Sequence, residues 1–221
     1  MCWSTVLLGR PPLSWAAVTT PEFKVPAFKE WAAVVQALLE GEQILDIRKG
    51  GIREKDRHFS VQSRWVWLYP TVEHQQAELL KPAYQRWVAT TESAAPPARA
   101  IRIEGWADIV GIATVSEPEV LDALDGRVIW SRGYVESRFR WKARDPLHVL
   151  ALRVHRLVEP ITVPFRDEYG GCTSWVDIAE LPDPKSLAST PALSDGAFDA
   201  RLKGCAEAIP GGFTPAVVKP D

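Results

Sequence analysis

Cysteine is scarce in this sequence, and long apolar runs are missing. Three cysteines in 221 residues, an odd number, do not suggest a disulfide framework and fit a reducing compartment. No apolar stretch approaches the roughly 20 residues that a membrane helix needs, and the first 15 residues lack the charged start of a signal peptide. We therefore expect a cytoplasmic protein with no membrane attachment.

A large excess of charge of one sign is also missing. The chain has 26 lysines and arginines and 28 aspartates and glutamates, for a net charge of -2, which excludes a uniformly basic, histone-like protein. The hydrophobic fraction of 46% is typical of globular proteins. We expect an irregular N-terminal arm over residues 1–26, a single α+β domain over 27–180, and a Pro/Ser-rich linker with a C-terminal helix over 181–221.

The hydrophobic periodicity predicts an alternation of helices and strands. Residues 43–48 and 61–69 alternate as strands do, and residues 101–115 offer one long strand or two, bent at Gly105 or Gly111. Helical spacing predicts helices over 28–40, 72–81, 116–126 and 197–209, whereas 90–100 is expected to be a surface loop. The fold class that follows is α+β, with a mostly antiparallel sheet or a small mixed β-barrel and flanking helices.

Residues 134–155 contain two alternating runs on either side of residues 143–146, which predicts a β-hairpin. If Arg144 and Asp145 form the loop, Val135, Phe139 and Trp141 face the core. The opposite face then carries cations from both strands: Arg138, Arg140, Lys142 and Arg153, together with His155.

Positive charge is concentrated in two segments. Residues 127–156 have eight basic side chains against two acidic ones, and residues 48–64 have six against two. Such segregation predicts a surface that binds nucleic acid or another anion. The side chains expected to form it are Arg48, Lys49, Arg138, Arg140, Lys142, Arg153 and His155. The alternative is an ordinary solvated sheet face in which Glu136 pairs with Arg153.

Catalytic and cofactor motifs are weak. Asp46 and Glu54, with Lys55, resemble loosely the metal-binding acids of a nuclease, but adjacent residues on a strand point to opposite faces. Cys172 is expected to be a small buried residue, with a nucleophile beside His148 or His155 as the alternative. The four histidines lack zinc-site spacing, so we expect no metal and no cofactor.

Aromatic residues leave two further alternatives open. Trp65, Trp67 and Tyr69 share one face of a predicted strand, where they form part of the core or a platform on which bases stack. The N-terminal arm, rich in tryptophan and proline, offers a surface for a protein partner. The third hypothesis is therefore an interaction subunit.

Three blocks of the sequence resemble a known family. "FKEWAAVVQALLEGEQILDIRKGGIRE", "WLYPTVEHQ" and "LHVLALRVHRLVEPITVPFRDEYGGCTSW" are similar to the bacterial family of unknown function DUF1802, over residues 28–178. The family implies no established activity. Some members are thought to lie near restriction–modification genes, which agrees with the nuclease alternative.

A shorter segment resembles a second family. Residues 41–48 have the spacing of the ASCH motif G-x-K-x-x-E-x-R, with Gln43 in place of the lysine and Asp46 in place of the glutamate. ASCH domains have a PUA-like fold, a small mixed β-barrel with flanking helices that is often used on RNA. This resemblance implies a barrel-like fold and a nucleic-acid partner.

Overall fold

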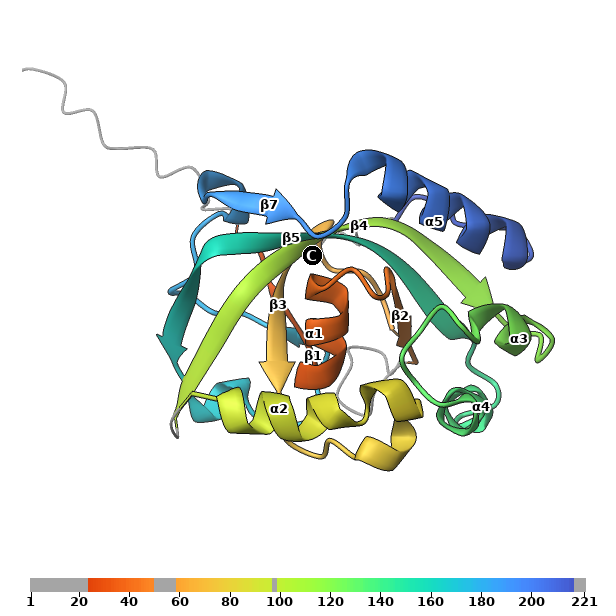
Figure 1. The fold of residues 1–221 in the computed structure, drawn as a ribbon, viewed down its shortest axis with the longest axis horizontal. Coiled ribbons are helices and arrows are strands. Elements are labelled where there is room, and N and C mark those ends of the chain that lie inside the picture. Colours follow the sequence, from red (N-terminus) through yellow and green to blue (C-terminus); the bar gives the residue numbers. More distant parts are fainter. Residues whose placement is uncertain (1–23, 50–58, 97–98, 217–221) are drawn as a thin grey trace, which may run out of the picture.

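The computed structural model describes residues 24–49, 59–96 and 99–216. It is an α+β fold with one seven-stranded, mostly antiparallel sheet in the order β2-β5-β4-β3-β1-β6, and β7 pairs with β5 (Figure 1). The strands are β1 (Ala27–Trp31), β2 (Leu45–Arg48), β3 (Trp65–Thr71), β4 (Ala100–Val115), β5 (Leu147–Pro164), β6 (Trp175–Val176) and β7 (Ser189–Pro191). The helices are α1 (Ala32–Leu39), α2 (Arg86–Ala94), α3 (Val120–Leu124), α4 (Arg132–Arg140) and α5 (Asp195–Ala208).

The long antiparallel pair β4–β5 is the backbone of the sheet. It pairs Ala100 with Pro164 at one end and Val115 with Leu147 at the other, and its register shifts after Ile103 and again after Ile109. The shifts coincide with the two glycines at which a bend was expected. At Gly105 a Cβ atom would lie 2.5 Å from the His155 carbonyl oxygen and 2.6 Å from Leu39, so a side chain there would collide with β5 and α1.

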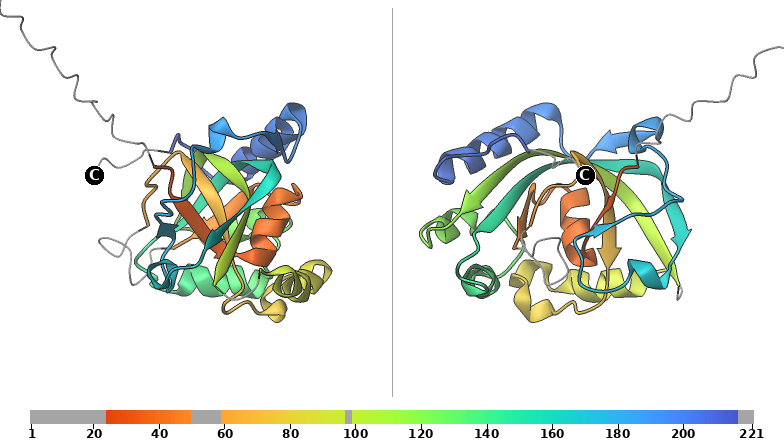
Figure 2. Two further views of the ribbon diagram at one scale, coloured as in Figure 1. Left: turned by 90° about the vertical axis from the view of Figure 1, so that its left-hand side faces the viewer. Right: turned by 180° about the vertical axis from the view of Figure 1, so that it is seen from behind.

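The sheet curls around α1. The views in Figures 1 and 2 show α1 on the concave side of the sheet, with α5 on one side of the molecule and α2 and α4 on the other. Seven of the eight residues of α1 are buried, so this helix fills the concavity. Among the described residues, the strand order runs as an open path from β2 to β6, and this matches the sheet alternative rather than a closed barrel.

Several sequence-based predictions of local structure are wrong. The helix expected from residue 28 begins only at Ala32, because residues 27–31 pair in parallel with β3 as β1. The helix expected over 72–81 is reduced to a 3-10 turn at Ala77–Leu79, and the expected loop over 90–100 contains the second half of α2. Helix α2 follows Pro82, and its residue Val88 is buried.

The predicted hairpin is also wrong in its first half. Residues 132–140 form α4, and β5 pairs with β4 rather than with this segment. Ser131 caps the helix by accepting a hydrogen bond from the Tyr134 amide at 3.3 Å, and Glu136 pairs with Arg132 four residues before it at 2.8 Å. Val135 and Phe139 are four residues apart, a spacing that keeps them on one face in a strand and in a helix alike.

The C-terminal part of the described chain packs on the sheet. The segment expected to be a linker contains β7, which pairs with residues 155–157 of β5. The predicted last helix is confirmed as α5, which begins at the cap Ser194 and buries Phe198. Ile209, just beyond it, is also buried.

Two expectations about single residues have opposite outcomes. Trp67 and Tyr69 are buried in the core, as the first alternative required. Cys172 is exposed, so the expectation of a small buried cysteine is wrong. None of the described helices combines the length and apolar character that crossing a bilayer requires.

Candidate functional site

An arginine held between two carboxylates bridges the open part of the sheet. On β2, Asp46 and Arg48 share one face, and the Arg48 Nε donates to Asp46 Oδ2 at 2.6 Å. The Arg48 Nη2 reaches β1, where it lies 2.7 Å from Glu30 Oε2 and donates to the Lys29 carbonyl at 3.0 Å. No backbone ladder joins β1 to β2 among the described residues, so these side-chain bonds link the two strands.

Burial makes this Glu30–Asp46–Arg48 cluster sensitive to protonation. The side chains of Arg48 and Glu30 are 13% and 10% exposed, and that of Asp46 is completely buried. The Arg48 guanidinium lies 4.0 Å above the centre of the Phe28 ring. Burial raises the pKa of Glu30 to about 7, and the attraction of Arg48 only partly opposes this. Asp46 Oδ1 has no hydrogen-bond donor among the described residues. A proton on Glu30 would supply that donor.

Gln43, which occupies the lysine position of the ASCH motif, has a structural role. Its amide nitrogen donates to the Leu45 carbonyl at 2.8 Å, and its amide oxygen accepts from the Ile129 backbone N–H at 2.8 Å. The side chain is only 2% exposed. Gln43 therefore satisfies two buried backbone groups.

Four of the predicted cations meet at the end of α4, and we call Lys49, Arg138, Arg140 and Lys142 the α4 cationic cluster. Lys49 follows β2 directly, and its ammonium donates to the Phe139 carbonyl and lies 5.5 Å from the centre of that ring. Arg138 and Lys142 lie 4.7 and 4.8 Å from the centre of the Trp141 ring. Segments about 90 residues apart in sequence thus meet at Phe139.

The members of the α4 cationic cluster differ in exposure. Lys49 is only 4% exposed. Burial lowers the pKa of Lys49, the charge of Asp145 opposes this, and the nearby charge of Arg138 adds to it. Arg140 has a side chain that is 78% exposed and lies 3.5 Å from Glu136. Arg138, Arg140 and Lys142 are therefore the members of the cluster that solvent reaches.

The other three predicted cations do not belong to the α4 cationic cluster. Arg48 is turned into the protein. Arg153 pairs with Asp195 and lies over the Phe198 ring, and His155 stacks on Trp106 with ring centres 4.1 Å apart. Arg48 pairs with His148 on β5, and Arg153 is five residues further along this strand. The distance between His148 and Arg153 along the strand is therefore about 17 Å. The expected basic sheet face is therefore wrong, because Arg138 and Arg140 lie on a helix.

The acids of the nuclease alternative do not form a metal site in the part of the chain that is described. Asp46 is engaged by Arg48, and Glu54 and Lys55 lie outside the described residues. Within residues 24–49, 59–96 and 99–216, no group of three or more histidine, cysteine, aspartate or glutamate side chains is placed to hold a metal ion. The N-terminal arm also lies mostly outside these ranges.

Sequence reasoning missed Glu30 and the part played by Trp141. Glu30 precedes an apolar helix, and its ion-pair partner Arg48 lies on a different strand, so only the fold brings the two together. Trp141 was expected in the core, but it is partly exposed and contacts two cations. Its position between Arg138, Arg140 and Lys142 was a usable signal, since cations near an aromatic ring are common at anion-binding surfaces.

The comparison with protein families agrees with the first of the two resemblances. The family model described as "Domain of unknown function (DUF1802)" matches residues 27–204. The chain belongs to the DUF1802 family. No curated protein matches this chain.

Two solved structures are similar to the DUF1802 chain in fold. They are crystal structures of two mutants of ZmASCH from Zymomonas mobilis, a serine-to-alanine and a tyrosine-to-phenylalanine variant. The first is 13% identical, covers 73% of this chain and 92% of its own, and has a TM-score of 0.42. The second is 12% identical, covers 71% and 91%, and has a TM-score of 0.41.

Proposed function

We propose that this DUF1802 protein binds single-stranded nucleic acid through the phosphate backbone at the α4 cationic cluster. The observation that carries the proposal is the placement of Arg138 and Lys142 over the Trp141 ring, beside the exposed Arg140 and with Lys49 holding the Phe139 carbonyl behind them. Lys and Arg side chains bind the phosphates of nucleic acids. Because phosphates follow one another along a strand, several neighbouring cations can each contact one.

The aromatic rings support this function in two ways. They hold Arg138 and Lys142 close to Trp141 through cation–π contacts, which reduces the side-chain entropy that phosphate binding would otherwise cost. They also place an indole, partly exposed, beside the phosphate-binding groups. A base can stack on such a ring without sequence preference.

The salt dependence of binding tests the proposal. With the full chain and labelled 20-nucleotide RNA and DNA strands, phosphate contacts from Arg138, Arg140 and Lys142 predict a slope of about -2.1 in the logarithm of the binding constant against the logarithm of salt. Raising the salt fourfold should then weaken binding about 20-fold. The double variant Arg138→Glu/Arg140→Glu should lose two contacts, so the same change should weaken its binding only about threefold.

A matched double variant controls for net charge. Arg86→Glu/Lys203→Glu changes the charge by the same amount at two exposed positions that are on α2 and α5 and do not belong to the cluster. It should keep the slope of the wild type. If the Arg138→Glu/Arg140→Glu protein, shown to be folded by circular dichroism, binds with the wild-type slope and affinity, the proposal is rejected.

A further inference from the structure

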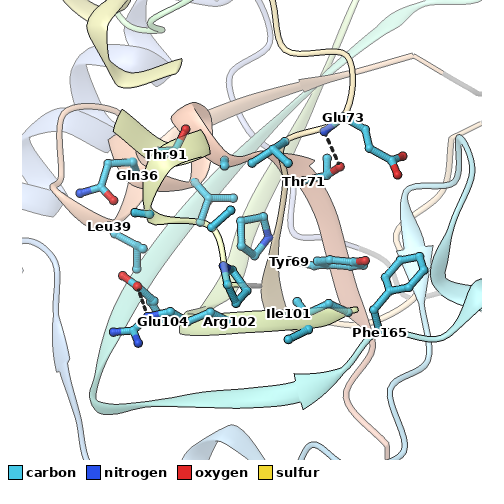
Figure 3. A pocket seen from close by; sticks show the side chains of 18 of the residues that line it. Gln36, Leu39, Tyr69, Thr71, Glu73, Thr91, Ile101, Arg102, Glu104 and Phe165 are labelled. Atoms are coloured by element: carbon cyan, nitrogen blue, oxygen red, sulfur yellow. Dashed lines mark hydrogen bonds and ion pairs between the residues drawn. The ribbon is translucent and has the colours of Figure 1, made fainter. Parts of the chain in front are cut away.

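A cavity of about 420 Å³ lies on a different part of the molecule from the α4 cationic cluster. It opens between α1, α2, the end of β3 and the beginning of β4, and none of the cluster residues lines it (Figure 3). Its volume is within the range of small-molecule sites in proteins, about 300–1,000 Å³.

The floor of the cavity is apolar. Val35 and Leu39 from α1 and Ile101 from β4 line it, and all three side chains are buried. Thr91 and Gln36 are the polar groups at the α1–α2 side. A ligand that fills this space must therefore have an apolar body.

The charged groups at the rim leave one carboxylate without a cationic partner. Arg102 pairs with Glu104 at 2.6 Å, and Arg99 pairs with Asp167 at 3.2 Å, so those charges are compensated. Among the described residues, Glu73 has no cation within ion-pair distance. Figure 3 shows Glu73, the Tyr69 hydroxyl and the Phe165 ring at one end of the cavity, and Leu39 toward the other.

The neighbouring Lys29 attracts Glu73 from outside the cavity: burial lowers the pKa of this lysine, and the charge of Glu73 partly opposes the effect. Lys29 lies 5.1 Å from the centre of the Tyr69 ring, donates to the backbone carbonyls of Tyr169 and Gly171, and does not line the cavity. Burial raises the pKa of Tyr69 to about 12, and the charge of Glu73 adds to this effect. The carboxylate of Glu73 is thus close enough to act on groups at this end of the cavity.

We propose that this cavity binds a small organic amine, protonated and with an aromatic or aliphatic body. The ammonium group lies between the Glu73 carboxylate and the Tyr69 and Phe165 rings, and the apolar body lies on Val35, Leu39 and Ile101. An ammonium ion is attracted both by a carboxylate and by the face of an aromatic ring. This inference is independent of nucleic-acid binding, because the two sites share no residue.

Three probes with the same indole body and different charge test the inference. Tryptamine is a cation, tryptophol is neutral and indole-3-acetate is an anion. Titrated into the full chain, tryptamine should shift the methyl resonances of Val35, Leu39 and Ile101 and bind up to about fivefold tighter than tryptophol, because a partly exposed ion pair adds that much. Indole-3-acetate should bind most weakly.

Three variants decide between the possible results. Glu73→Gln should reduce tryptamine binding to that of tryptophol, whereas Glu78→Gln, an exposed acid nearby on the 3-10 turn, should change nothing. Ala94→Phe, at an exposed position lining the cavity, should weaken all three probes. Equal binding of the three probes would overturn the proposal. So would the absence of methyl shifts, or tryptamine binding that Glu73→Gln and Ala94→Phe leave unchanged.

Discussion

The buried carboxyl of Glu30 should make the stability of this protein fall as the pH rises from about 4.5 to about 7. In the unfolded chain this group loses its proton near pH 4.5, and in the folded protein burial raises its pKa to about 7. Between these values the folded state holds a proton that the unfolded state has lost, so acid favours the folded state. Above pH 7 both states are ionised and the loss is complete.

The size of the effect follows from the two pKa values. At about 1.4 kcal/mol for each pH unit, the interval from 4.5 to about 7 corresponds to about 3 kcal/mol in the free energy of unfolding. The variant Glu30→Gln cannot ionise, and its amide can still accept from Arg48 and donate to Asp46. Relative to the wild type, it should therefore gain about 3 kcal/mol between pH 4.5 and pH 8.

Urea unfolding at several pH values, followed by tryptophan fluorescence, measures this difference. The comparison with Glu78→Gln, an exposed glutamate, removes the contribution of general charge effects. If the difference between Glu30→Gln and the wild type is independent of pH, Glu30 titrates normally. If the variant loses stability as the pH rises, the attraction of Arg48 outweighs burial, and the reasoning is refuted.

Three other substitutions test the fold and the cluster by the same unfolding assay. Arg48→Leu leaves two buried carboxylates without their cation and should cost about 3–5 kcal/mol at pH 8, with a smaller loss at pH 5, where Glu30 is protonated. Gln43→Ala leaves the buried N–H of Ile129 without an acceptor and should cost about 2 kcal/mol. Gly105→Ala places a Cβ atom 2.5 Å from the His155 carbonyl oxygen and should cost about 1–3 kcal/mol.

The outcomes that contradict these predictions are equally specific. If Arg48→Leu loses the same free energy of unfolding at pH 5 and at pH 8, the contribution of Arg48 does not depend on whether Glu30 is protonated. A neutral Gln43→Ala would mean that water replaces the amide. Gly196→Ala, in α5 with open space around its Cβ, is the control for Gly105→Ala and should be neutral or stabilising.

Local patterns predicted those elements whose periodicity has one interpretation. The strand β4 has glycines at both of its register shifts, so the places of its bends were predictable, whereas only the pairing with β5 decided that it is one strand rather than two. The helix α5 was predictable from the apolar spacing that includes Phe198 and Ile209. The segment from Tyr134 to Trp141 was not, because Val135 and Phe139 fit both a strand and a helix, and the cap at Ser131 favours the helix.

The functional residues divide in the same way. The sequence by itself determined that positive charge is concentrated near residues 48–49 and 138–142, because charge is a property of each side chain. Only the tertiary structure decided that Lys49 reaches the end of α4 while Arg48 turns inward to Glu30, since these contacts join segments separated by up to 90 residues. The curl of the sheet around α1 brings β1 and β2 together. Neither strand carries a local signal for that contact, because it depends on how the whole core packs.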